Sequence, residues 1–255
     1  MKQSFIEFHA IRVLRPGALW FCISLVTLAT AGNAVAGSFS ATPARIDLRG
    51  TQRTAVVTLR NADSAPLTVQ ATLVAWSQPK GNDEYAETHE LLVTPPVFTI
   101  PPNGEQIVRI ALRRTPDPAL ELPYRTFFQE IPQGARPDFT GLNIALKVSV
   151  PIFVQPESAA AGKLDWELHT QPDGKLRVDA VNTGTAHVRV TDFTIVYANL
   201  AEATHVNVVK YVLPGSRVSW IVAQPPTVTG STTAKIHGFS DRGEFSVDAS
   251  IAQSH

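Results

Sequence analysis

One stretch of alternating residues constrains the fold of this chain more than any other feature. It is residues 141–154, GLNIALKVSVPIFV, in which every even position from Leu142 to Val154 is aliphatic. Successive side chains of a β-strand point to opposite faces, so this period of two predicts one strand with a continuous apolar face. Strands of globular proteins commonly have only about five or six residues. We therefore expect part of this face to extend beyond the chain's own core and to serve another molecule.

The first residues have the pattern of a secretory signal peptide. Three basic residues precede an apolar run over residues 18–31, and the A-x-A sequence typical of a cleavage site follows at residues 34–36. The apolar run is shorter than the about 20 residues of a membrane-spanning helix. We predict cleavage after Ala36, export of the mature chain and no stable insertion in a membrane. Retention of the segment as an amphipathic anchor is the alternative.

The composition of the mature chain limits its partners and its sources of stability. Removal of 36 residues from 255 leaves 219, a length typical of two domains, and takes away the single cysteine, Cys22. An exported chain without disulfides depends on its hydrophobic cores for stability. The signal also holds 3 of the 22 basic and 1 of the 22 acidic residues, which leaves 19 basic and 21 acidic side chains. This balance offers no electrostatic attraction to nucleic acid or to an anionic membrane surface.

Short segments with strand character follow the signal at a spacing of about ten residues, which is typical of a β-sandwich. Segments rich in Asn, Asp, Pro and Gly separate them. The acidic stretch at residues 82–90 is expected to form a solvated hairpin. The strands expected in the first half of the chain are 40–48, 54–60, 68–76, 90–93, 106–113, 124–131 and 142–154.

Residues 155–162, QPESAAAG, interrupt this pattern and are interpreted as a hinge. A second series of expected strands follows at 164–170, 176–182, 188–197, 206–212, 218–223, 233–239 and 245–251. The sequence therefore predicts an all-β fold of two Ig-like β-sandwich domains joined end to end at an angle, with the N-terminal domain at residues 37–155 and the C-terminal domain at residues 156–255. The Ig-type cysteine pair is absent, so the term applies to the architecture only.

The sequence offers no constellation of residues for catalysis, metal binding or cofactor binding. The six histidines of the mature chain lie singly, without the spacing that brings two rings to one metal, and are expected at the surface or in turns. Motifs for nucleotide binding and for a nucleophilic serine are absent. We therefore expect no enzyme, no metal and no cofactor.

An ordered set of motifs runs through the mature chain: ATPARIDL at 41–48, TPPVF at 94–98, PPNG at 101–104, YRTFFQEIP at 124–132, the alternating strand, VNTG at 181–184 and LPGS at 213–216. In order and spacing, this set resembles one known family, the PapD-like periplasmic pilus chaperones of the chaperone–usher pathway. The VPIFV ending of the alternating strand and the Tyr124-Arg125 pair resemble the archaic, Csu-type branch of that family.

This resemblance implies a role for the alternating strand. In that family, the last strand of the first domain is lent to a pilin subunit that lacks a strand, and its aliphatic side chains fill the subunit's open groove. The residues expected to be donated are Leu142, Ile144, Leu146 and Val148. The residues expected in the chain's own core are Val150, Ile152 and Val154.

The resemblance also implies partners and a location. The partners are pilin or fimbrial subunits, which the chaperone keeps from aggregating, and an outer-membrane usher that receives them in the periplasm. Neither ATP nor a cofactor is needed. An exposed apolar stripe invites association, so the free protein is expected to be able to form a self-dimer.

The family further binds the subunit's C-terminal carboxylate, using an arginine of the first strand and a lysine of the donor strand. Arg45 matches the arginine, and a planar guanidinium suits bidentate binding of a carboxylate. The lysine position is Pro151 in this chain, which leaves Arg125 and Lys147 as the candidate second cations. We favour Arg125, because Lys147 is four residues from Pro151, about 13 Å at about 3.3 Å per residue.

Two smaller features complete the resemblance, and two alternatives stay open. Thr94-Pro95-Pro96 is similar to the family's cis-proline turn. Glu121 is expected to be an ion-pair partner near the cleft between the domains, but Gln155 replaces the arginine that usually pairs with it. The alternative functions are a secreted sandwich module that binds carbohydrate or another surface ligand through loops with clustered aromatic side chains, and a periplasmic hydrolase assembled from distant residues.

Overall fold

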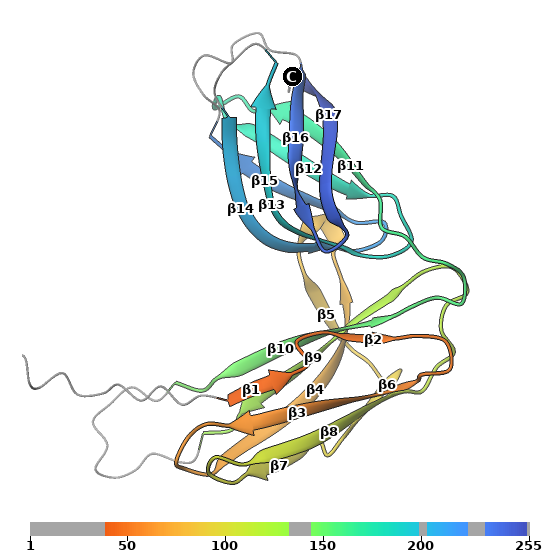
Figure 1. The fold of residues 1–255 in the computed structure, drawn as a ribbon, viewed down its shortest axis with the longest axis vertical. Coiled ribbons are helices and arrows are strands. Elements are labelled where there is room, and N and C mark those ends of the chain that lie inside the picture. The colour runs from red at the N-terminus through yellow and green to blue at the C-terminus, as the bar shows by residue number, and fades with distance from the viewer. Residues whose placement is uncertain (1–38, 133–143, 199–202, 224–232, 254–255) are drawn as a thin grey trace, which may run out of the picture. The chain divides into compact units, whose positions relative to one another are not determined.

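The computed structural model of the chain describes residues 39–132, 144–198, 203–223 and 233–253 (Figure 1). The predicted signal peptide and Leu142 lie outside the described residues. Apart from one 3-10 turn, η2 (Pro79–Gly81), the regular elements are strands, which confirms the predicted all-β fold. Within the ranges given above, no helix is long and apolar enough to cross a membrane.

The first sandwich consists of two sheets. One sheet has the strand order β1 (Phe39–Thr42), β3 (Thr54–Asn61), β8 (Glu105–Leu112), β6 (Leu91–Thr94). The other has the order β2 (Ile46–Leu48), β10 (Lys147–Val154), β9 (Leu122–Glu130), β4 (Leu67–Ser77), β5 (Glu84–Glu87), and β7 (Val97–Ile100) also pairs with β4.

Alternate residues of facing strands form the core of this sandwich. Val57 of β3 and Val108 of β8 are fully buried, and they meet Val150, Ile152 and Val154 of β10 in one hydrophobic cluster. The expectation that these three residues of β10 belong to the chain's own core is therefore confirmed.

Several predicted boundaries in the first sandwich are wrong. Residues 40–48 form two strands, because β1 pairs with β3 in one sheet and β2 pairs with β10 in the other. β7 was not expected, since four residues are too few for a clear period. The predicted solvated hairpin, in contrast, is confirmed, since Glu84–Glu87 form the exposed strand β5 antiparallel to β4. The long alternating strand begins only at Lys147, and residues 144–146 are not in a strand.

The second sandwich forms one continuous path of strands. β17 pairs with β16 over most of its length and then with β11 at residues 251–253, so it links the two halves of the path. Figure 1 shows β16 and β17 side by side. The order is β14 (Ala203–Val212), β13 (Val188–Tyr197), β16 (Thr233–Ser240), β17 (Gly243–Gln253), β11 (Leu164–Thr170), β12 (Leu176–Asn182), β15 (Arg217–Val222).

The predicted strands of this second sandwich agree closely with the observed ones, since β11, β12 and β13 have the predicted bounds. The cis-proline turn expected within residues 94–96 is also present, with the cis bond at Thr94–Pro95, and a second cis bond lies at Thr42–Pro43. Residues 37–255 form one compact unit. The predicted division at residue 155 stays a prediction, and it falls between the end of β10 and the start of β11.

A buried asparagine closes a strand end in each sandwich. Asn61 donates from Nδ2 to the carbonyl oxygen of Ala65 at 2.8 Å. Asn182 donates from Nδ2 to the carbonyl oxygens of Ala186 and Val212, both at 2.8 Å, and its Oδ1 accepts from the backbone N–H of Gly184 at 2.9 Å. Both side chains are fully buried, so these bonds have no competition from water.

Replacement of Asn182 by alanine is expected to destabilise the protein. Buried carbonyl and N–H groups would lose their partners, which lowers the free energy of unfolding by about 2 kcal/mol or more. Urea denaturation of the mature protein measures the change, with Asn207→Ala on the exposed side of β14 as the control. Equal stability of Asn182→Ala and the control would contradict this account.

Candidate functional site

β10 has one paired edge and one largely open edge. β9 pairs with it along its whole length, whereas β2 covers the opposite edge only at residues 152–154. Among the described strands, none pairs with this second edge over residues 147–151. Unpaired backbone N–H and C=O groups on such an edge form a template onto which another strand can add.

From Val150 back to Ile144, the apolar side chains on alternate positions become increasingly exposed. Val150 is 1% exposed. Leu146 and Val148 are half-buried and pack against the core of the first sandwich. Ile144 is 71% exposed. The stripe therefore continues beyond the core of the protein and presents an aliphatic surface beside the open edge.

Two arginines lie in the same row as Pro151. Arg125 of β9 pairs directly with Pro151. On the other side, Ile46 pairs with Ile152 in a parallel ladder, so Arg45, which precedes Ile46, is level with Pro151. Lys147 pairs with Gln129 and lies four positions along β10. The structure thus brings Arg45 and Arg125 to one level of the sheet and leaves Lys147 at another.

Arg45 already has two carboxylate partners. Its Nε donates to Asp47 Oδ2 at 3.0 Å, and its Nη1 donates to Asp241 Oδ2 at 3.1 Å. Partial burial would lower the pKa of Arg45, but the two carboxylates raise it above the usual value. The side chain remains 38% exposed. Arg45 is therefore a fixed cation that still reaches the surface.

Arg125 is a cation held by an aromatic ring. Its guanidinium carbon lies 3.9 Å from the centroid of the Trp76 ring, and its Nη1 donates to Ser149 Oγ at 2.9 Å. Its Nε is buried without a hydrogen-bond partner. No carboxylate of the described residues forms an ion pair with it. The positive charge of Arg125 is therefore positioned but not neutralised.

Lys147 differs from both arginines, because it lies over an exposed aromatic surface. Its Nζ is 4.3 Å from the centroid of the Phe127 ring, and the side chain is exposed. Phe127 in turn meets Tyr85 edge-on, with 5.2 Å between the ring centroids. This cation–aromatic group covers the outer face of β9 and β10.

Glu121 has a partner that the sequence did not reveal. Its fully buried carboxylate accepts from Gln155 Nε2 at 2.6 Å and lies 2.6 Å from Nδ1 of His187. His187 is 2% exposed, so the expectation that every histidine lies at the surface or in a turn is wrong for this residue. A lone histidine carries no local signal of burial, because its carboxylate partners are 66 and 54 residues away in the sequence.

The first sandwich agrees with one family of proteins. Residues 38–160 match the model for the PapD N-terminal domain, described as a pili and flagellar-assembly chaperone. The first sandwich therefore belongs to the PapD-like chaperones. This is a family of assembly chaperones and not of enzymes, which confirms that the chain is no enzyme. A comparison with curated proteins gives no match.

Solved structures share the fold of this chain. The CsuC–CsuE chaperone–tip adhesion subunit complex of the archaic Csu pili of Acinetobacter baumannii matches with 21% identity and a TM-score of 0.63, over 86% of this chain and 100% of that one. The CupB2 chaperone of Pseudomonas aeruginosa matches with 19% identity and a TM-score of 0.55, over 84% and 100%. The complex of the Salmonella enterica SafA pilin with the SafB chaperone matches with 18% identity and a TM-score of 0.56, over 83% and 96%.

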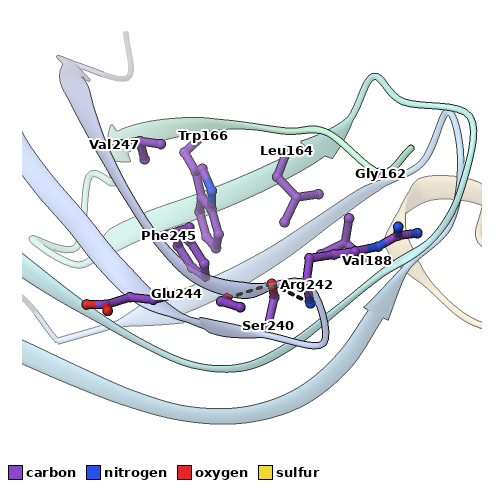
Figure 2. Close-up of a pocket in the computed structure, with 10 residues that line it drawn as sticks. Gly162, Leu164, Trp166, Val188, Ser240, Arg242, Glu244, Phe245 and Val247 are labelled. Atoms are coloured by element: carbon purple, nitrogen blue, oxygen red, sulfur yellow. Dashed lines mark hydrogen bonds between the residues drawn. The ribbon is translucent and has the colours of Figure 1, made fainter. Parts of the chain in front are cut away.

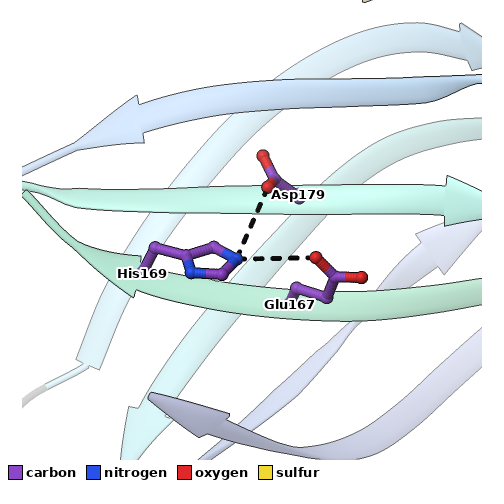
Figure 3. A group of neighbouring side chains, drawn as sticks. All are labelled: Glu167, His169 and Asp179. Carbon is purple, nitrogen blue, oxygen red and sulfur yellow. Dashed lines mark hydrogen bonds and ion pairs between the residues drawn. The ribbon is translucent and has the colours of Figure 1, made fainter. Parts of the chain in front are cut away.

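A group of potential metal ligands lies in the second sandwich, where the sequence predicted no metal (Figure 3). His169 Nε2 is 3.5 Å from Glu167 Oε2 and 3.7 Å from Asp179 Oδ2. The same two oxygens accept from Arg217 Nη1, at 2.5 and 3.0 Å, and Arg177 lies 3.2 Å from Asp179. The arginines already supply the positive charge here, so the group is an ion-pair cluster rather than a metal centre.

A small hollow opens between β11 and β17 (Figure 2). It has a volume of about 160 Å³, below the roughly 300–1,000 Å³ of typical ligand pockets, and Trp166 and Phe245 form its aromatic wall. These rings pack with Phe193 and Trp220 against the core of the sandwich. The aromatic cluster is thus part of the core, which does not favour a carbohydrate-binding module.

The division between core and exposed stripe makes a stability prediction for two glutamate variants. Ile144→Glu is expected to change the free energy of unfolding by no more than about 0.5 kcal/mol, because the side chain is in water. Val150→Glu is expected to lower it by more than about 3 kcal/mol, because it buries an unpaired charge. Urea denaturation compares the two, and similar losses would mean that Ile144 packs in the core.

Proposed function

We propose that this protein is a periplasmic chaperone that binds pilin or fimbrial subunits by donor-strand complementation, prevents their aggregation and delivers them to an outer-membrane usher. The observation that carries the proposal is the open edge of β10 beside an aliphatic stripe that leaves the core. The proposed donor residues are Leu142, Ile144, Leu146 and Val148, of which Leu142 lies outside the described residues. The signal peptide over residues 1–36 belongs to the same proposal, because it accounts for export.

The physical chemistry of the stripe suits this function. A subunit that lacks a strand exposes both a backbone edge and an apolar groove. β10 offers the matching backbone groups, and each aliphatic side chain that becomes fully buried contributes about 1.5–3 kcal/mol. When no subunit is bound, the same edge in two copies can pair, so self-dimerisation is part of the proposal. The VPIFV ending of β10 supports the archaic, Csu-type branch.

We further propose that Arg45 and Arg125 bind the C-terminal carboxylate of the subunit from the two sides of Pro151. Arg125 has no carboxylate partner in the described part of the chain, so its charge is available. Arg45 would exchange Asp241 for the incoming carboxylate. That exchange has a small cost, because a partly exposed ion pair contributes only about 0–1 kcal/mol.

Subunit capture tests the donor strand. Mature protein with Ile144→Glu or Leu146→Glu is expected to lose co-purification of pilin-type subunits from the periplasm of its native host, because a charge cannot enter an apolar groove. Val209→Glu is the matched control, since Val209 is 68% exposed on β14 of the other sandwich. Normal capture by both stripe variants would rule out the donor role.

The anchor is tested by removing each cation in turn. Arg45→Ala and Arg125→Ala are each expected to weaken capture by about 2 kcal/mol or more, because the bound carboxylate would lose a charged partner. Lys147→Ala is expected to change it little, because it lies in another row of the sheet. Titration with a purified subunit measures the three affinities, and a larger loss for Lys147→Ala than for Arg125→Ala would reverse the assignment.

A further inference from the structure

His187 lies between two carboxylates where the two sandwiches meet. It precedes β13, and its ring stacks on Phe153 of β10 with 3.6 Å between the centroids. Its Nδ1 is 2.6 Å from Glu121 Oε1, and its Nε2 is 3.4 Å from Asp241 Oδ2. The longer distance is that of an ion pair rather than of a well-formed hydrogen bond. Each ring nitrogen therefore faces a carboxylate oxygen.

This geometry favours the doubly protonated ring. A neutral imidazole has one N–H and one lone pair, so one of the two carboxylates would face a lone pair. Glu121 is held as an acceptor by Gln155 Nε2 and by the backbone N–H of His187 at 3.0 Å. Asp241 accepts from the backbone N–H of Arg189 at 2.9 Å. Both carboxylates are thus arranged as acceptors. The imidazolium is the form that presents an N–H to each of them, as a hydrogen bond to Glu121 and as an ion-pair contact with Asp241.

The other charged or ionisable groups near the ring are arginines and one tyrosine. Arg242 Nη2 donates to the carbonyl oxygen of His187 at 3.3 Å. Tyr211 lies 5.5 Å from the ring between centroids, and Arg189 lies over Tyr211 at 5.8 Å. Arg45 reaches the site through Asp241. These cations oppose a charge on His187, but they contact the carbonyl group, the phenol ring and Asp241 rather than the ring nitrogens.

The pKa values agree with this arrangement. Burial would lower the pKa of His187, but the contacts with Asp241 and Glu121 outweigh it and raise the pKa above 6.5. Burial would likewise raise the pKa of Asp241, yet the contact with His187 and the bond from Arg189 lower it to about 2. His187 and Asp241 thus each favour the charged form of the other.

We propose that protonated His187 bridges the two sandwiches through Glu121 and Asp241, and that it thereby holds Asp241 against Arg45 and positions that guanidinium. The bridge itself does not depend on the proposed function. The role of the positioned Arg45 as a carboxylate anchor, in contrast, rests on the proposed function. On this account the junction is strongest in acid and loosens when His187 loses its proton.

The sign of the pH dependence follows from the raised pKa. His187 binds its proton more tightly in the folded protein than in the unfolded chain, so its contribution is fully present below pH 6.5. It is lost as the pH rises from 6.5 through the higher folded pKa. For each pH unit by which the pKa of His187 in the folded protein exceeds that in the unfolded chain, the equilibrium constant for folding is tenfold larger in acid than in alkali.

Unfolding of the mature protein between about pH 5.5 and about pH 8.5 tests the bridge. The wild type is expected to lose stability above pH 6.5, and His187→Gln is expected to lose this dependence. His237→Gln on an exposed position of β16 is the control that keeps it. An unchanged pH dependence in His187→Gln would overturn the proposal.

Nuclear magnetic resonance measures the same proton directly. The ring signal of His187, assigned through the backbone resonances of residue 187 in the wild type, is expected to titrate above 6.5, and Asp241→Asn is expected to lower that midpoint. This titration of the wild type remains valid even if His187→Gln does not fold. A midpoint at or below 6.5 in the wild type would overturn the bridge.

The signal of the Arg45 side chain tests the positioning. Its Nε–H resonance, assigned with Arg45→Lys, is expected to shift with the same midpoint as the His187 ring. A constant Arg45 signal would overturn the positioning while leaving the bridge. None of these measurements uses a subunit, so a failure of subunit capture would count against the proposed function and not against the bridge.

Discussion

The pairing of β10 is the constraint on which the rest of the structure depends. β9 pairs with one edge along its whole length, but β2 covers the other edge only at its last three residues. The same strand therefore closes the core of the first sandwich at its C-terminal end and exposes backbone and aliphatic side chains at its start. This combination of a paired and an open edge in one element suits the proposed strand donation.

The charges of the first sandwich are arranged around Pro151. Proline cannot act as a cation, and in the proposed anchor Arg125 of the paired strand takes this role at the same level. Trp76 holds that arginine by its ring, so the guanidinium is positioned without a carboxylate partner among the described residues. Arg45 differs because Asp47 and Asp241 already bind it. In the proposed anchor, Arg125 is thus available to an anion, whereas Arg45 has to exchange a partner.

The junction shows how a substitution at one position is compensated by a residue far away. Gln155 can donate a hydrogen bond to Glu121 but cannot neutralise it. The positive charge comes instead from His187, which stacks on Phe153 and reaches Asp241 with its second nitrogen. A histidine in this place makes the link between Glu121 and Asp241 sensitive to pH, which an arginine would not.

The sequence by itself determined the all-β class and most strands, because a period of two is a local property of the chain and survives without knowledge of any partner. It also identified Arg45, Arg125 and the alternating strand as candidates. Only the tertiary structure decided where that strand begins, since pairing depends on how far β9 and β2 extend. It also decided that His187 is buried between Glu121 and Asp241, because residues so far apart in the sequence are brought together only by the packing of one sandwich on the other.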